Sequence, residues 1–222
     1  MADVTKKETL TRDKVLAGAT ELADRVGIEA FTIRKLAAEL DTKPMTIYHH
    51  VPSKQAIIDG IVDIVFGEIE LPATDVIWRT AIWRRCVSAR EVLARHRWAP
   101  PLMESRTSPG PATLRHHDAV LGCFLRGGLS LQMTAHAYAV IDSYVYGFAM
   151  QEANLPFHGT EQIGELAEEI LGALPADEFP NLVEFTARHV LQPGYAFGSS
   201  FEFGLDLILD GFEATASDPD SE

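Results

Sequence analysis

The sequence predicts an all-α protein made of a small N-terminal and a larger C-terminal helical domain. Apolar residues recur three or four positions apart along most of the chain, as they do on one face of a helix. Ser, Thr and Pro stand where these segments begin, which suits helix starts. No segment shows the strict alternation of a half-buried strand. With 222 residues, 46% of them hydrophobic, the chain can bury a sizeable core.

The first four predicted helices begin at residues suited to that place. Thr11, Thr32 and Ser53 can each cap a helix through the side-chain oxygen, and Pro44 suits a first helical turn. Gly27 can end the first helix. The helices are predicted over residues 11–27, 32–41, 44–50 and 53–68.

The remaining helices are longer and are interrupted by one proline-rich stretch. Residues 97–113 contain several prolines and should be irregular or short-helical. The acidic tail, 216–222, has the composition of a disordered segment. The helices are predicted over residues 74–96, 112–126, 130–153, 161–173, 179–191 and 199–214.

The net charge of −13 is spread unevenly along the chain. Residues 1–54 carry nine Lys and Arg against eight Asp and Glu, whereas residues 55–222 carry ten against 24. Every lysine lies at or before Lys54. The N-terminal segment can therefore approach a polyanion that the acidic remainder of the chain would repel.

Residues 32–50 have the pattern of a helix-turn-helix. Two short helices are joined by three residues, and the second begins at Pro44. In this motif the first helix packs on the core and the second enters the DNA major groove. The residues available to pack between the two helices are Leu36, Ala37, Leu40, Ile47 and Val51.

The opposite face of the second helix carries side chains suited to DNA. Met45 and the Thr46 methyl group can contact thymine methyls, and the Tyr48 hydroxyl and His50 imidazole can donate to phosphate oxygens. Lys54 lies in the first turn of the next helix, where a positive charge is unfavourable because of the helix dipole. A phosphate bound at that N-terminus would make the lysine favourable there. The residues predicted to face outward are Pro44, Met45, Thr46, Tyr48 and His49.

Residues 27–63 resemble the DNA-binding region of TetR-family transcriptional regulators. The resemblance lies in the arrangement F-T-x-R-x-L-A-x-x-L followed by Y-x-H-V-x-x-K, and it begins near Thr11. One departure is Asp41, where the family usually has Gly in the turn; Asp tolerates the left-handed conformation better than most residues. More weakly, the 130–153 helix and FEFGLDLILDGFE resemble the tetracycline-repressor C-terminal domain.

The resemblance implies a homodimer that binds a pseudo-palindromic double-stranded DNA operator and releases it when a small-molecule effector binds. It implies a DNA-binding domain over 1–54, a linking helix over 53–68, and a ligand-binding and dimerisation domain over 69–215. Steep salt dependence of operator binding is expected. The DNA contacts would fall on Thr32, Arg34, Lys43, Pro44, Met45, Thr46, Tyr48, His49, His50 and Lys54.

Two C-terminal helices have apolar columns that can pair across a two-fold axis as a four-helix bundle. The same columns could instead face the core of a single chain. Guided by the resemblance, we predict a dimer interface that includes Val140, Tyr144, Gly147, Phe148, Phe201, Leu205, Ile208 and Phe212.

The effector site is predicted among the aromatic and polar residues of the 78–151 region. Mostly apolar cavities with a few polar groups are typical of ligand sites, although each residue taken singly fits a place in the core better than a ligand contact. The candidates are Arg85, Trp98, Met103, His117, Phe124, Tyr138 and Gln151.

We predict no cofactor and no protein metal site. Tetracycline repressors hold a magnesium–drug chelate through a His shortly after a His-Arg pair; aligned on His96-Arg97, that position falls on Met103, which cannot bind a hard cation. A second drug-contacting His position falls near Glu70. The resemblance therefore argues against tetracycline as the effector.

Other classes of function are less consistent with the sequence. An enzyme could use His116-His117-Asp118 and the acidic cluster of Glu165, Glu168 and Glu169, but adjacent His residues point to different faces of a helix. The sequence is also compatible with a transcriptional activator, or with a regulator that responds to a protein partner instead of a small molecule.

Cys86 and Cys123 are expected to be buried free thiols. The N-terminus lacks a signal-peptide pattern and the apolar stretch 135–150 is shorter than a bilayer span, so we expect a cytoplasmic protein without a membrane partner.

Overall fold

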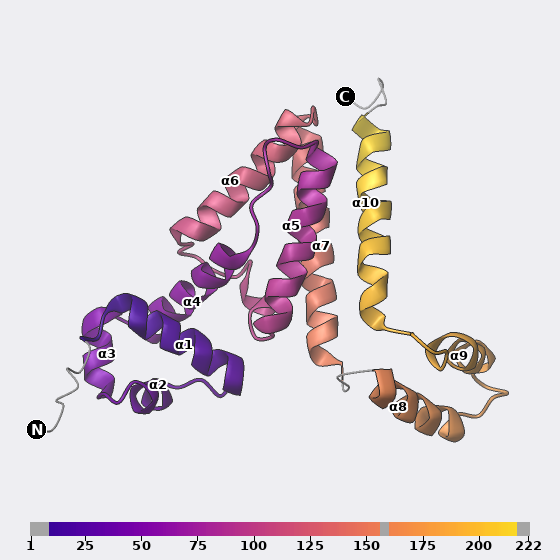
Figure 1. The fold of residues 1–222 in the computed structure, drawn as a ribbon, viewed down its shortest axis with the longest axis horizontal. Helices are drawn as coiled ribbons and strands as arrows, with labels where there is room; N and C mark the ends of the chain where they lie inside the picture. Colours follow the sequence, from indigo (N-terminus) through magenta and orange to yellow (C-terminus); the bar gives the residue numbers. More distant parts are fainter. Residues whose placement is uncertain (1–8, 156–159, 217–222) are drawn as a thin grey trace, which may run out of the picture. The chain divides into compact units, whose positions relative to one another are not determined.

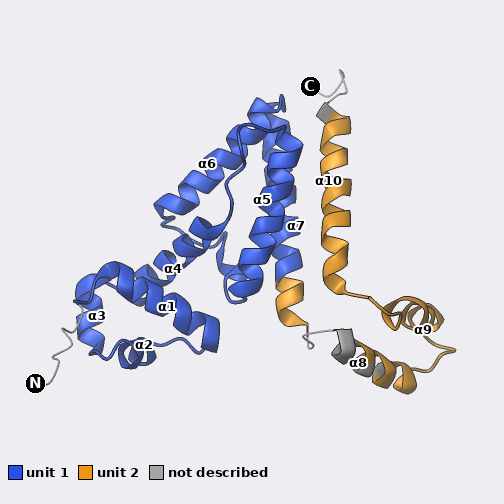
Figure 2. Cartoon of the chain, in the orientation of Figure 1, with its two compact units in different colours: residues 1–149 blue, residues 150–222 orange. Residues whose placement is uncertain are grey.

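The computed structural model describes residues 9–155 and 160–216, and all of its regular structure there is helical, as predicted. The predicted disordered tail lies outside the described residues except for Ala216. The chain forms two compact units, residues 1–149 and 150–222 (Figure 2). No helix within the described ranges is long and apolar enough to cross a membrane.

The first four helices of the first unit match the predicted ones to within two residues at each end. Thr11, Thr32 and Ser53 are their caps, each accepting a hydrogen bond from the backbone N–H three residues on. Figure 1 shows α2 and α3 packed beside α1. The helices are α1 (Arg12–Val26), α2 (Ile33–Glu39), α3 (Pro44–His50) and α4 (Lys54–Glu68).

The rest of the first unit contains α5 (Trp78–Arg95), a 3-10 turn (Pro100–Leu102), α6 (Pro111–Arg126) and α7 (Leu131–Asn154), whose last turn enters the second unit. The predicted start of α5 at residue 74 is wrong. Ile77 has an extended backbone and is 68% exposed, and the helix begins only at the next residue, Trp78. Cys86 and Cys123 are buried free thiols, as predicted.

The second unit contains α8 (Thr160–Ala173), α9 (Pro180–Phe185) and α10 (Ser200–Ala216). The helix predicted over 179–191 is α-helical only as far as Phe185. A π-helical turn, Thr186–Val190, follows and contacts both α8 and α9.

The turn of the helix-turn-helix contains Asp41 in the left-handed conformation, with φ of 44°. A β-branched residue there would bring its Cβ against the backbone. We expect Asp41→Val to lower the free energy of unfolding by roughly 1–2 kcal/mol, and Asp41→Asn to leave it nearly unchanged. Urea unfolding of the three proteins measures this, and equal stability of the Val and Asn variants would contradict it.

Candidate functional site

The exposed face of α3 holds the side chains predicted to contact DNA. Met45 is 68% exposed and Tyr48 37%, while Ile47 on the opposite face is fully buried. Thr46 and His50 are half-buried. The remaining predicted contacts, all exposed, are Thr32, Arg34, Lys43, Pro44, His49 and Lys54.

Lys54 forms a hydrogen bond within the DNA-binding domain that could not be predicted from the sequence. Its Nζ donates to the backbone carbonyl of Phe31 at 3.1 Å and lies 5.8 Å from the centre of that ring. Phe31 is fully buried and directly precedes Thr32, the cap of α2. Lys54 therefore fixes the start of α2 to the start of α4, in addition to offering a cation at this surface.

Helix α4 is held to the start of α6 by a carboxylate. Asp63 Oδ1 accepts hydrogen bonds from the Thr113 backbone N–H at 2.8 Å and from the Thr113 hydroxyl at 2.9 Å. A carboxylate at a helix N-terminus satisfies N–H groups that have no partner within the helix and is favoured by its dipole. A Cβ at Gly110 would lie 2.3 to 2.5 Å from the Asp63 carboxyl group, so glycine permits this close approach.

A second polar contact joins the N-terminal helices to α5. His96, which is buried, has Nδ1 at 2.7 Å from Asp24 of α1 and Nε2 at 3.1 Å from Glu68 of α4. Trp98 donates to the same Asp24 oxygen at 2.7 Å. Burial alone would raise the pKa of Glu68, but hydrogen bonds from Arg95 and His96 lower it below the ordinary value.

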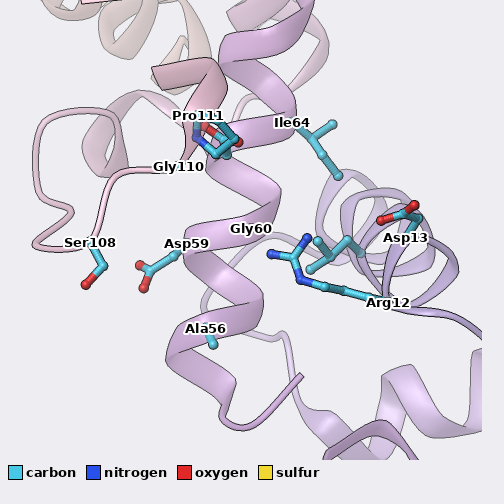
Figure 3. Close-up of a pocket in the computed structure, with 11 residues that line it drawn as sticks. Arg12, Asp13, Ala56, Asp59, Gly60, Ile64, Ser108, Gly110 and Pro111 are labelled. Atoms are coloured by element: carbon cyan, nitrogen blue, oxygen red, sulfur yellow. The ribbon is translucent and has the colours of Figure 1, made fainter. Parts of the chain in front are cut away.

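A cavity of about 430 Å³ lies beside the contact between α4 and α6. Figure 3 shows Arg12 reaching from α1 toward α4, and Asp59 facing Ser108 of the segment before α6. Asp59 also forms an ion pair with Arg106 at 3.4 Å. None of the residues predicted to bind an effector lines this cavity.

The predicted effector residue Arg85 lies at the centre of a buried polar cluster. It is 1% exposed, its Nη1 is 3.0 Å from Asp142 Oδ1, and its Nε donates to His116 Nε2 at 2.7 Å. Because the guanidinium can only donate, His116 accepts through Nε2 and carries its proton on Nδ1. That Nδ1 and Asp142 Oδ2 are buried without a hydrogen-bond partner among the described residues.

The charges in this cluster follow from burial and from the Arg85–Asp142 pair. Burial, followed by the positive charge of Arg85, lowers the pKa of His116 to about 3, so this imidazole is neutral. Burial alone would lower the pKa of Arg85, but the Asp142 carboxylate raises it above the ordinary value. Burial raises the pKa of the Tyr146 hydroxyl and that of the Cys86 thiol, the latter to about 11.

Two further predicted residues adjoin this cluster. His117 Nδ1 and the Tyr138 hydroxyl are hydrogen-bonded, and a donor atom of His117 lies within 4.8 Å of carboxylate oxygens of Glu104 and Asp142. Burial, followed by the negative charge of Asp142, raises the pKa of Glu104. The effector residues predicted from the sequence did not include Glu104, His116, Asp142 or Tyr146. The charged Asp142 within an apolar helix is a signal that could have identified one of them.

The other predicted effector residues lie elsewhere. Trp98 is bonded to Asp24, and the ring of Phe124 lies 5.8 Å from that of Trp78. Met103 is buried, and Gln151 is exposed and belongs to the second unit. The structure thus brings together Arg85, His117 and Tyr138 out of the predicted set.

The residues predicted for a dimer interface differ in exposure. Val140 of α7 is 43% exposed, whereas Phe148, Phe201, Leu205 and Phe212 are buried. Tyr144, Gly147 and Ile208 are half-buried. The most exposed large apolar side chains of α10 are Phe203 and Leu207, which our prediction did not include.

Family models match both parts of the chain. Residues 15–61 match "Bacterial regulatory proteins, tetR family", and residues 71–216 match "Tetracyclin repressor-like, C-terminal domain".

Individual relatives cover nearly the whole chain. An HTH-type transcriptional regulator of Saccharopolyspora erythraea is 31% identical, with 95% of this chain and 87% of the relative aligned. The HTH-type transcriptional repressor DrrR1 of Streptomyces coeruleorubidus is 32% identical, over 93% of this chain and 78% of the relative. The structure of Streptomyces coelicolor ActR in complex with actinorhodin superposes with a TM-score of 0.77 at 27% identity, over 95% of this chain and 100% of that chain.

Proposed function

Because this chain belongs to the tetR family of bacterial regulatory proteins, we propose that it is a repressor that a small-molecule effector releases from a palindromic operator. The chain is a transcriptional regulator, and its relatives are regulators rather than enzymes. The observation that carries the proposal is the pairing of an exposed α3 face with a buried polar cluster in α5–α7.

DNA binding would use the exposed face of α3 together with the starts of α2 and α4. Met45 and Thr46 would contact base edges in the major groove, because they lie near the N-terminal end of α3. Arg34, Tyr48 and Lys54 would contact phosphates and set the position of the helix. Base contacts and phosphate contacts are thus assigned to different residues, and mutation can distinguish the two roles.

A homodimer would present two such surfaces to one duplex. Each unit exposes apolar side chains that would be available to a partner copy: Val140 of α7 in the first unit, and Phe203 and Leu207 of α10 in the second. A two-fold dimer requires a two-fold operator, with half-sites about one helical turn of DNA apart.

The effector would interact with the buried polar cluster of Arg85, His116 and Asp142. Buried polar atoms without partners are costly, and a ligand that supplies those partners gains affinity and specificity. Two similar proteins support this type of control: the structure of ActR holds actinorhodin, and DrrR1 is a transcriptional repressor by name. The departures at Met103 and Glu70 still argue against tetracycline.

Helix α6 would carry the effector signal to DNA. His116 and Thr113 lie one turn apart on α6, and Thr113 is bonded to Asp63 of α4. A small displacement of α6 would therefore move α4, which begins next to the DNA-binding surface. The effector can shift the equilibrium only by its difference in affinity for the two forms.

Gly110→Ala tests this connection. The added methyl group must displace Asp63, so we expect loss of the Asp63–Thr113 bonds and a stability loss of about 1–3 kcal/mol. Operator binding should also weaken, because α4 is then held less firmly. Gly67→Ala, in α4, places its methyl group only at an ordinary 3.7 Å contact with Ala112 and is the matched control. Unchanged stability and operator affinity in Gly110→Ala would contradict the role of this contact.

The proposed function as a whole is tested by selecting DNA from a random pool with the purified protein. The expected product is a two-fold symmetric site, and a thermal-shift screen should then find a compound that stabilises the protein and releases it from that site. An asymmetric site, or a stabilising compound that leaves operator binding intact, would contradict the proposal and favour a regulator controlled in another way.

A further inference from the structure

Three side chains from separate segments of the first unit converge beside Arg85. Glu104 follows the 3-10 turn, His117 lies in α6 and Asp142 in α7. Each offers a donor atom, and the three atoms all lie within 4.8 Å of one another. Bonds of about 2.0–2.2 Å to one metal ion place its ligands roughly 3–4 Å apart. Small side-chain rotations would therefore bring all three donors to a common ion.

Asp142 has one carboxylate oxygen beyond the one that pairs with Arg85. The residue is 5% exposed, and its Oδ2 is buried without a hydrogen-bond partner among the described residues. The ion pair with Arg85 involves Oδ1, at 3.0 Å from Nη1. Oδ2 is therefore a buried acceptor oriented by the pair but available to a further cation.

His117 is held in the manner of a metal-binding imidazole. Its Nδ1 is hydrogen-bonded to the Tyr138 hydroxyl. Because Tyr138 occupies Nδ1, the ring nitrogen left for a metal ion is Nε2. Hydrogen bonds of this kind fix the tautomer and ring orientation of histidine ligands. The Phe66 ring, 5.5 Å away, provides an apolar side wall.

We propose that Glu104, His117 and Asp142 form a binding site for a divalent transition-metal ion, for which Zn²⁺ is the best match. One imidazole and two carboxylates suit a borderline dication better than Cu(I), which prefers sulfur, or Mg²⁺, which prefers oxygen and water. The two carboxylates exceed the single charge of Arg85, so the cluster keeps one net negative charge, which attracts a cation. These residues are distinct from Met103 and Glu70, where the resemblance places the magnesium–drug contacts.

The sequence offered no spacing by which to predict this site. Its three residues are contributed by a loop and two helices, whereas the adjacent His116 and Asp118 do not take part. His116 is directed to Arg85 instead, and Asp118 is exposed. A bound ion would tie α6 to α7 and to the preceding loop, and should therefore raise the melting temperature.

The test is a Zn²⁺ titration of the full chain after chelator treatment and dialysis, followed by calorimetry without DNA. We expect one ion per chain in the wild type. Glu104→Gln, at an exposed residue that should not affect folding, and His117→Ala should each weaken Zn²⁺ binding at least tenfold. Glu91→Gln and His136→Ala, exposed residues of the same types outside the cluster, are the matched controls.

Unchanged Zn²⁺ affinity in both cluster variants, or no binding by the wild type at submillimolar Zn²⁺, would overturn the proposal. Loss of binding in His136→Ala would do the same, because it would identify an unrelated surface site. The inference does not rest on the proposed function. Zinc binding is measured without operator or effector, so either proposal can fail while the other stands.

Discussion

Replacing Asp142 with Asn should lower the free energy of unfolding by about 3–5 kcal/mol, because the Arg85 charge is then buried without an opposite charge. Arg85 is 1% exposed and lies 3.0 Å from Asp142. His116, which also contacts Arg85, is neutral and cannot replace a carboxylate. Chemical denaturation at one fixed protein concentration and with a chelator present measures the difference.

Two further variants show whether the loss arises from the unpaired charge. Asp118→Asn removes an exposed carboxylate of α6 and should have little effect on stability. The double variant Arg85→Met/Asp142→Leu removes both charges and should recover most of the loss, since buried ion pairs add little net stability over well-packed apolar residues. A loss below about 1 kcal/mol in Asp142→Asn would show that Arg85 is compensated by another group.

Operator affinity should fall about a thousandfold between 50 and 200 mM monovalent salt, as it does for proteins that make six or more phosphate contacts. In a dimer, Arg34, Tyr48 and Lys54 of each subunit would contact phosphates, which gives about six contacts in total. With its net charge of −13 the chain as a whole repels DNA, so electrostatic attraction must come from the positive groups of this surface. Fluorescence anisotropy with a labelled operator over a salt series gives the slope.

Arg34→Gln is the informative comparison for the salt series. The side chain is exposed, so its replacement should leave folding intact. The slope of log affinity against log salt should become shallower by about two, one phosphate contact for each subunit. A wild-type affinity that is flat across the salt range would show that phosphate neutralisation is not the source of binding.

The N-terminal helices could be predicted from sequence because their signals are local. Thr11, Thr32 and Ser53 cap helices through bonds that span three residues, and Ile47 alternates with exposed neighbours over one helical turn. The left-handed Asp41 is expected from the resemblance, because the family usually has Gly at this position of the turn. The long helices were predicted as well, except at two places: Ile77, an exposed apolar residue that precedes α5, and the 179–191 segment, which is α-helical only as far as Phe185.

The buried cluster could not be predicted in the same way, since it depends on contacts between segments distant in sequence. Arg85, His116 and Asp142 lie on three helices, and only their packing shows that they meet. Trp98 donates a hydrogen bond to Asp24, 74 positions away, and no pattern of apolar residues in the sequence predicts that contact. The Asp63–Thr113 bonds similarly join residues 50 positions apart.

The most direct test of the account is the sequence preference of Met45→Ala compared with that of Tyr48→Ala. Met45 is 68% exposed near the N-terminal end of α3 and is assigned to bases, whereas Tyr48 is assigned to phosphate. On a panel of operators with single base-pair changes, Met45→Ala should alter the preference at one position in each half-site. Tyr48→Ala should weaken binding to all operators similarly. An unchanged preference in Met45→Ala would contradict the claim that this face of α3 reads the operator.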